Sequence, residues 1–568
     1  MSSEHLLGPP AVARRWGICG VTGARTTCDW FTVGASNHSM LSRAAGYRLR
    51  KVALRQNPRA LRRFAVDKDF SPPTLRDREG KRLQCCVSPP VRMVETYFDS
   101  PDLRLRAAGV VVCRRAGAEG HWLLRAPGPD GVRKVRLPPD GADPPGEIRR
   151  LVTGRLGEAP LRPRLTLDAD LEVVQLAARV GTPLVRLVDE AVVSERRDDG
   201  QVRRWRNLVL EPLDAGGRLV DAVAGQLVAA GARPVGATTV PDLALDQPGR
   251  GPRPSGLLAI RVGQLVEEIA DRDLQLRLGE PEGVHDLRVA VRRLRSLLAT
   301  FGRLLGPEPT LPLRAELGWL GDLLGAAREA EVIEVRIGNA LRTVAAAERL
   351  GDACADLIGN ARSACVTTRE RLDEGLASAR YRAAVELLRR FAEDLAVADD
   401  LGPGGGSGSG KGRRSERGGA GTNRSGEVEA VGEAVSRELR RARRRVRDAR
   451  SADATRRDEA LHAARKQARR VRYAVEVLRP CRNRRDRRLE EAFATVQEVL
   501  GARNDAVVAR RFLVAEGARA RSLPEGNGFT YGILAEREAQ AVLAADDAFG
   551  PAWQAAARAV RGWSAHRR

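Results

Sequence analysis

The sequence predicts a multidomain α+β protein in which a β-rich region precedes a longer, all-helical region. From about Arg59 to Asp246, short apolar runs are separated by Gly, Pro and Asp turn signals, which is typical of strands. After Gly256, apolar residues recur at three- and four-residue spacing and proline becomes rare, which predicts helices. A chain of 568 residues is long enough for about two to four domains with their own cores.

Composition divides the chain further. Residues 1–58 mix Gly, Arg, Cys and Trp without periodicity, so we expect a poorly ordered N-terminal extension. The predicted β domain covers residues 59–246, and the Pro/Gly-rich segment 247–256 is a linker. The helical domain covers 257–568, interrupted by a Gly/Ser-rich stretch at 402–426 that we expect to be a flexible insert.

The charge balance predicts an anionic partner. Lys and Arg number 97 against 73 Asp and Glu, which gives a net charge of +24. Most of the excess is arginine, which matches phosphate oxygens bidentately. Aromatic residues make up only 4% of the chain, so a base-stacking surface for single-stranded nucleic acid is poorly supplied.

Cysteine usage and hydropathy indicate the compartment. The eight cysteines form no CxxC pair, which favours a reducing compartment without a zinc site. No apolar run approaches the roughly 20 residues of a membrane span, and the start of the chain lacks a signal-peptide pattern. We therefore expect a cytoplasmic protein without membrane insertion.

The helical half contains an internal repeat. The segment 284–295 recurs as 461–472, and each copy is followed by a second matching element, 324–330 and 500–506. A long motif repeated in the same order predicts two similar helical bundles around a pseudo-twofold axis.

Each repeat carries a histidine–arginine stripe. At about 100° per residue, the first stripe falls within an arc of about 80° on one helix face. Its members are His285, Arg288, Arg292 and Arg295, and the second copy has His462, Arg465, Arg469 and Arg472 with Lys466 beside them. Cations at this spacing repel, so either neighbouring carboxylates or a bound polyanion must offset the cost. A solvated arginine face is the alternative, and a metal site is disfavoured because each stripe has a single histidine and no acid.

The repeated H-x-x-R-x-x-x-R-R-[LV]-R stripe, with the later L-G-x-x-[RN]-[DE] element, resembles the CHAD (conserved histidine α-helical) domain over about 260–563. The resemblance implies two pseudo-symmetric four-helix bundles flanking a basic channel that binds inorganic polyphosphate, with the nine stripe residues above as its ligands. It also implies that Glu329 and Asp505, in the later element, cap helices or hold arginines. Nucleic acid presents the same phosphates and is the main competitor ligand.

The segment Glu95–Leu105 (ETYFDSPDLRL) resembles the Y-F-D-T-x-x-L-x-L signature of the CYTH domain, the triphosphate tunnel metalloenzymes, and the likeness extends over about 59–246. The family implies an eight-stranded antiparallel tunnel, with basic side chains gripping a triphosphate and glutamates holding divalent metal. Its reactions are hydrolysis of tripolyphosphate or thiamine triphosphate, or cyclisation of ATP.

The sequence departs from this pattern where the metal ligands belong. The E-x-E-x-K motif falls at 59–63 without its glutamates, a strand glutamate is replaced by Lys134, and the late E-x-E-x-E reads 207–211 with only Glu211 kept. Asp189, Glu190 and Glu211 are the remaining candidates for metal ligands. The S-x-S-K near the end, at 237–240, lacks its lysine.

The basic side of the tunnel is better preserved. Candidate phosphate ligands are Arg114, Arg115, Arg125, Arg133 and Arg136, and strand register decides which of them face inward. Metal-dependent hydrolysis needs carboxylates, so the sequence predicts a pseudoenzyme that requires no cofactor. Mg²⁺ or Mn²⁺ would be needed only if the tunnel were active.

Three functions follow from the sequence. The first is a non-catalytic polyphosphate-binding protein, with polyphosphate granules as an additional location. The second is an active metal-dependent triphosphatase or polyphosphatase. The third is a scaffold for nucleic acid or for the surface of a storage granule.

Overall fold

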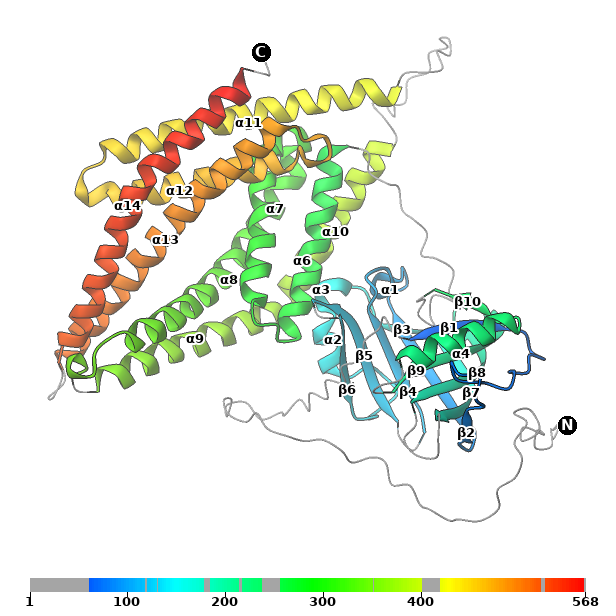
Figure 1. Ribbon diagram of the computed structural model, residues 1–568. Coiled ribbons are helices and arrows are strands. Elements are labelled where there is room, and N and C mark those ends of the chain that lie inside the picture. The colour runs from blue at the N-terminus through cyan, green and yellow to red at the C-terminus, as the bar shows by residue number, and fades with distance from the viewer. Residues whose placement is uncertain are drawn as a thin grey trace, which may run out of the picture. The chain divides into compact units, whose positions relative to one another are not determined.

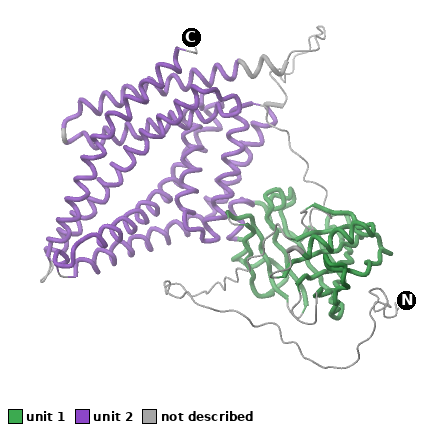
Figure 2. The backbone as a smooth tube through the Cα atoms, viewed as in Figure 1, with its two compact units in different colours: residues 1–149, 159–248 green, residues 150–158, 249–568 purple. Residues whose placement is uncertain are grey.

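The computed structural model (Figure 1) describes residues 61–565, except 118–119, 130, 178–183, 214–216, 237–255, 351, 401–418 and 523–526. The predicted extension 1–58 and almost all of the predicted linker 247–256 therefore lie outside the described residues. The chain forms two compact units (Figure 2). One comprises residues 1–149 and 159–248, and the other comprises 150–158 and 249–568.

The first unit, called the β unit below, is built on one antiparallel sheet of ten strands. The strand order is β10-β1-β9-β8-β7-β3-β4-β5-β6, with β2 added to β7. The strands are β1 (Arg62–Val66), β2 (Gln84–Val87), β3 (Val91–Asp99), β4 (Val111–Arg115), β5 (His121–Gly128), β6 (Gly131–Leu137), β7 (Arg162–Ala177), β8 (Val185–Arg196), β9 (Val202–Pro212) and β10 (Arg233–Val235). Helices α1 (Arg104–Ala107), α2 (Gly146–Leu151) and α4 (Gly217–Ala229) complete the unit.

Alternation along the strands gives the sheet two distinct faces. The outer face packs Phe64, Leu208 and Leu187 against Val223 and Leu227 of α4 in a dry core. The opposite face, called the inner face below, combines an apolar cluster around Tyr97, Cys113 and Leu167 with charged side chains. Lys134 on β6 and Glu211 on β9 act on each other electrostatically although their strands are far apart in the strand order, which indicates that the sheet curls toward this face.

The second unit, called the helical unit below, contains the remaining helices. They are α6 (Leu257–Arg277), α7 (Gly283–Leu305), α8 (Pro307–Arg342), α9 (Ala353–Ala377), α10 (Ala379–Asp400), α11 (Gly419–Ser451), α12 (Ala454–Glu476), α13 (Arg484–Ala520) and α14 (Phe529–Ser564). The short helix α3 (Thr153–Leu156) also belongs here by its contacts, since the buried Arg155 donates to Glu267 and Asp271 on α6. None of the described helices is long and apolar enough to cross a membrane.

Two apolar clusters hold the helical unit together. The larger one runs through both halves and includes Phe301 of α7, Val471 of α12 and Phe493 of α13. The smaller one joins the far ends of the long helices, where Ile337 of α8 meets Leu513 of α13. The long helices α8 and α13 are therefore anchored at both ends.

The architecture confirms the α+β class, with an antiparallel sheet followed by helices. One boundary was wrong: α11 begins at Gly419, so the last part of the expected insert 402–426 is helical, while 402–418 lies outside the described residues. Residues 419–426 directly precede a segment with helical apolar periodicity. Once that helix has formed, each preceding residue that joins it adds one hydrogen bond, so the helix extends toward the N-terminus. The division into two four-helix bundles stays a prediction.

Candidate functional site

The two stripe helices have the same amphipathic construction. On α7, Leu287, Val291 and Leu294 are buried, and on α12 Leu461 and Val471 are buried in the same core. These apolar positions recur at helical spacing, so the arginines between them are forced to another side of each helix. The core thus fixes the direction in which the stripes point.

Seven of the nine stripe residues line a cavity of about 820 Å³, whose walls are formed by α7, α8, α12 and α13. Its cationic lining consists of Arg288, Arg292, Arg295, Arg314, Arg328, Arg336, His462, Arg465, Lys466, Arg469, Arg470, Arg503 and Arg511. Both copies of the repeat therefore contribute to a single site.

Four arginines from α7 and α12 lie close enough to act on one another across this cavity. Burial, together with the charges of Arg292, Arg465 and Arg288, lowers the pKa of Arg469 to about 9. Burial and the charges of Arg292 and Arg465 likewise lower the pKa of Arg288. The guanidinium groups are still protonated at neutral pH, so the free protein holds a concentration of positive charge that its own fold disfavours.

Carboxylates also line the cavity, at Asp322, Glu329, Asp458, Glu459 and Asp505, but few of them contact this group of arginines. Within the described parts of the chain, no carboxylate lies within 4 Å of the guanidinium groups of Arg288, Arg292 or Arg469, and Arg465 has only Asp505, at 3.9 Å. The Nε atoms of Arg465 and Arg469 are buried and have no hydrogen-bond partner among the described residues. An anion with several oxygens would supply what these donors lack.

The glycine of each Leu-Gly pair in the repeat makes room for a stripe arginine. A Cβ atom at Gly325 on α8 would lie 3.8 Å from Nη2 of Arg288, and one at Gly501 on α13 would lie 3.6 Å from Nη2 of Arg465. The guanidinium groups therefore lie directly against the backbone of the wall helices. A methyl group at either glycine would be in van der Waals contact with the guanidinium group.

The two histidines differ in surroundings. Nδ1 of His462 lies 2.8 Å from Oδ1 of Asn504, as in a ring N–H donating to an amide oxygen, and the residue lines the cavity. His285 is half-buried near the start of α7 and is not part of the lining. Burial lowers the pKa of both; Arg328 lowers that of His285 further, and Lys466 and Arg465 lower that of His462.

Arg472 also stands apart from the cavity lining. Its Nε lies 3.7 Å from Oε1 of the buried Glu476, and its guanidinium lies over the ring of Tyr473 at 5.2 Å from the centroid. Glu476 also pairs with Arg261, at 2.8 Å. Although Arg472 and Arg295 are equivalent in the repeat, the nearby acid gives Arg472 a structural contact, whereas Arg295 lines the cavity.

Some lining residues were missed by sequence reasoning. Arg470 and Tyr473 lie on α12, while Arg314, Arg336 and Arg511 come from the wall helices. Arg470 is part of the repeated motif and could have been included. The wall arginines have no counterpart in the stripe pattern, so the sequence carries no comparable signal for them.

In the β unit, strand register separates the five candidate phosphate ligands. Arg115 pairs with Glu95 in the ladder, and Arg125 pairs with Lys134, which places both arginines on the inner face together with Arg136. Arg114 and Arg133 fall on the opposite face, because successive side chains alternate across a strand.

The carboxylates of the inner face are already engaged by arginines. Glu95 accepts bonds from Nη2 of Arg115 at 2.6 Å and from Tyr97 Oη at 2.6 Å. Glu190 lies 3.5 Å from Arg63. Glu211, the proposed metal remnant, accepts from Arg186 at 3.0 Å.

Asp189, the other candidate, points to the outer face and binds Arg206 through both oxygens, at 2.8 and 2.5 Å. Among the described residues, no group of three or more His, Cys, Asp or Glu is placed to hold a metal ion. The carboxylates that are present do not fit the divalent metal of a tunnel hydrolase, because arginines occupy their oxygens.

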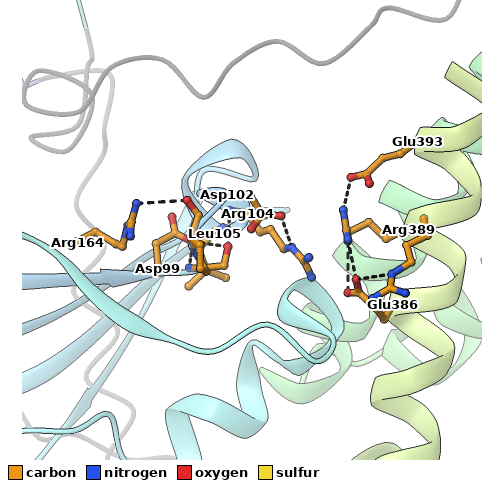
Figure 3. A network of polar contacts seen from close by, with 11 residues as sticks. Asp99, Asp102, Arg104, Leu105, Arg164, Glu386, Arg389 and Glu393 are labelled. Atoms are coloured by element: carbon orange, nitrogen blue, oxygen red, sulfur yellow. Dashed lines mark hydrogen bonds and ion pairs between the residues drawn. The ribbon is translucent and has the colours of Figure 1, made fainter. Parts of the chain in front are cut away.

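The signature aspartate of the β unit has a structural task. Asp99 accepts backbone N–H bonds from Ser100, Leu105 and Arg106 at 2.7 to 2.9 Å, which closes the turn around α1 (Figure 3). Burial raises its pKa, and these bonds act against that rise. The signature can therefore persist for folding even where metal ligands are lost.

On α10 in the helical unit, Arg389 is held by Glu386 and Glu393 (Figure 3).

Comparisons with known proteins agree with the repeat. Residues 261–514 match the family model of the CHAD domain, so the helical unit contains this domain. Two uncharacterized proteins of Mycobacterium tuberculosis, Rv2226 of strain H37Rv and MT2285 of strain CDC 1551, are each 28% identical to the chain over 480 residues. These matches cover 80% of this chain and 87% of each relative.

Three solved structures are also similar. PptA from Streptomyces chartreusis is 19% identical and matches 53% of this chain and 99% of its own, with a TM-score of 0.41. The CHAD domain from the plant Ricinus communis is 26% identical over 52% of this chain and 92% of its own, with a TM-score of 0.37. A putative adenylate cyclase from Bacillus halodurans is 13% identical over 33% of this chain and 97% of its own, with a TM-score of 0.22.

Proposed function

We propose that this protein binds inorganic polyphosphate in the cavity of the helical unit and that its β unit is a tunnel-like domain without hydrolase activity. The observation that carries the proposal is the group of four arginines, two from each repeat, that face one another with almost no acidic partner. A row of fixed guanidinium groups suits a linear chain of identical phosphates, because bidentate contacts can repeat along it.

The size and lining of the cavity favour this ligand over nucleic acid. A volume of about 820 Å³ is in the range of small-molecule sites, whereas a nucleic acid duplex needs an open surface. The aromatic residue in the lining, Tyr473, is only 3% exposed and has Arg293 and Arg472 over its ring. It therefore offers no face on which a base could stack.

The lack of hydrolysis is inferred from the inner face of the β unit. Phosphoanhydride cleavage in the tunnel enzymes that this unit resembles depends on metal ions held by carboxylates. Here Glu95, Glu190 and Glu211 are each paired with an arginine, and Lys134 stands where a further carboxylate is expected. A cation approaching this face would have to displace three arginines.

Binding is tested with the variant Arg288→Ala/Arg465→Ala, which removes one cavity arginine from each repeat. Each lost charge-assisted hydrogen bond costs about 1.5–3 kcal/mol, so affinity for long-chain polyphosphate should fall by about 100-fold or more, and each single variant should lose less. The dependence of affinity on salt should also weaken. Titration calorimetry at several salt concentrations measures both quantities.

The matched control is Arg369→Ala/Arg380→Ala, which removes the same charge from arginines paired with Asp373 and Glu316 outside the cavity. It should leave the affinity nearly unchanged. Equal affinity and equal salt dependence in the cavity variant and the control would refute the cavity as the binding site.

Catalysis is tested on the full chain with tripolyphosphate and Mg²⁺ or Mn²⁺. We expect no release of phosphate above background in a colorimetric assay. Metal-dependent turnover that disappears in Glu211→Gln would establish the enzyme instead.

A further inference from the structure

A second concentration of arginine lies on α11, outside the cavity. Between positions 437 and 450 the helix reads RELRRARRRVRDAR, with Glu438 and Asp448 as its acids. Leu439, Ala442 and Val446 on one side of this segment are buried in the core of the helical unit. Arg440, Arg441, Arg443, Arg444, Arg445, Arg447 and Arg450 are exposed.

These exposed arginines cover the whole outward side of the helix. At about 100° per residue, their positions spread over an arc of about 220°, against about 80° for each cavity stripe. From Arg440 to Arg450 the axial rise is about 15 Å. None of these residues lines the cavity, whose walls come from α7, α8, α12 and α13. The arginine face of α11 is therefore a separate feature, and not an edge of the cavity.

The positive charge of this face is nearly uncompensated. Arg441 donates to Glu438 at 2.5 Å, but among the described residues no carboxylate lies within 4 Å of the other six exposed guanidinium groups. Some other exposed arginines of the same unit are held by acids, as Arg380 is by Glu316. Like charges three and four residues apart on one helix repel and destabilise it. An external polyanion bound to this face would offset that loss of helix stability.

We propose that the arginine face of α11 binds the phosphate backbone of double-stranded nucleic acid without reading its sequence. The wide arc places guanidinium groups on both flanks of the helix, which suits the two phosphate rows that border a groove, whereas a single phosphate chain needs only one narrow row. The exposed arc between 440 and 450 carries no Asn, Gln or aromatic side chain to read a base edge or to stack on a base. It also carries no large apolar side chain that would insert into a membrane.

The test compares variants of the full chain. In the α11 variant, Arg440, Arg443, Arg444 and Arg447 are each changed to Gln, a good helix former that keeps the length of the side chain. The control variant makes the same change at four other exposed arginines: Arg362, Arg371, Arg519 and Arg521. Fluorescence anisotropy with a labelled DNA duplex of random sequence is measured at several salt concentrations, and circular dichroism melting checks the folding of each variant.

We expect the α11 variant to lose about tenfold or more in duplex affinity, and its salt dependence to weaken by about three to four phosphate contacts. The control variant and Arg288→Ala/Arg465→Ala should bind duplex like the unmodified chain, and the α11 variant should keep its affinity for polyphosphate. Equal losses in the α11 and control variants would overturn the proposal, because they would reflect net charge alone. A loss confined to polyphosphate, or a loss of duplex binding in the cavity variant, would overturn it as well.

Discussion

The cavity of the helical unit and the inner face of the β unit are both lined with arginine, but they differ in how many of these arginines have a carboxylate partner. On the inner face, Arg115 and Arg186 each have a carboxylate partner within hydrogen-bonding distance. In the cavity, Arg288, Arg292 and Arg469 have none among the described residues. Arginine content therefore does not distinguish a binding site from a structural network. What sets the cavity apart is that arginines from both repeats lie close together without a carboxylate contact, which leaves several guanidinium donors for one external anion.

Replacing one buried arginine in each unit, Arg206 on the outer face of the sheet and Arg469 in the cavity, should change stability in opposite directions. Arg206 in the β unit is buried, bound to both oxygens of Asp189 and to the carbonyls of Lys68 and Phe70. Arg206→Met leaves a buried charge unpaired and should lower the free energy of unfolding of that unit by about 3–5 kcal/mol. Arg469→Met removes an unpartnered buried charge and should raise the stability of the helical unit by about 1–3 kcal/mol.

Hydrogen exchange measures the two units separately, with protection in β8 and β9 and in α7 and α12 as the readouts. Arg469→Met should also weaken polyphosphate binding while it stabilises the protein. If Arg469→Met destabilises the helical unit as strongly as Arg206→Met destabilises the β unit, the contrast between a paired and an unpaired buried arginine fails.

A smaller effect on polyphosphate affinity is expected from comparing two equivalent arginines of the repeat. Arg295 lines the cavity, while Arg472, its counterpart, is engaged by Glu476 and Tyr473. Arg295→Ala should lower polyphosphate affinity about tenfold, and Arg472→Ala less than about threefold. Calorimetric titration of the two variants side by side measures the difference. Equal losses would mean that Arg472 turns toward the ligand when it binds.

The smallest predicted effect concerns pH. Burial and neighbouring cations depress the pKa of His462 below its ordinary 6.5 in the free protein. Its neutral form is thus favoured, and stability that is present above that ordinary value is lost as the pH falls through the depressed pKa. A bound polyanion favours the charged form, so binding takes up a proton and affinity should rise about two- to fivefold as the pH falls from about 8 to about 6.

His462→Gln should remove most of this pH dependence. Calorimetry in buffers of different ionisation enthalpy measures the proton uptake directly. Uptake that is the same in His462→Gln and in the unmodified chain would assign it to another group, such as His285.

The repeat motif predicted much of the helical site, because helical periodicity converts spacing directly into a shared face. It correctly grouped Arg288 and Arg292 on one face, and the equivalence of the two copies anticipated a common site. It could not show that Arg472 would be diverted by Glu476, since that contact depends on how Arg261 and Arg293 pack around the acid. Repetition indicates equivalent positions along a helix but not equivalent neighbours.

The β unit was harder to predict at the level of single residues. The sequence predicted a β-rich region, but the direction of an arginine on a strand depends on a register that a shift of one residue reverses. That is why Arg115 and Arg125 were grouped with Arg114 and Arg133, which the ladder places on the other face. The ion pair between Asp189 and Arg206 could not be predicted from the sequence either, because the two residues lie on different strands and nothing in the local sequence links them.

Equivalent arginines from α7 and α12 opposite each other across one cavity have a statistical consequence. A chain of identical phosphate units has no polarity, and a site built from a repeated element accepts it in either direction. Each additional unit beyond the length of the site adds another position at which the same contacts form. For the proposed polyphosphate ligand, the number of equivalent bound arrangements therefore grows linearly with chain length. We expect longer chains to bind more tightly for this statistical reason, with no new contact to the protein.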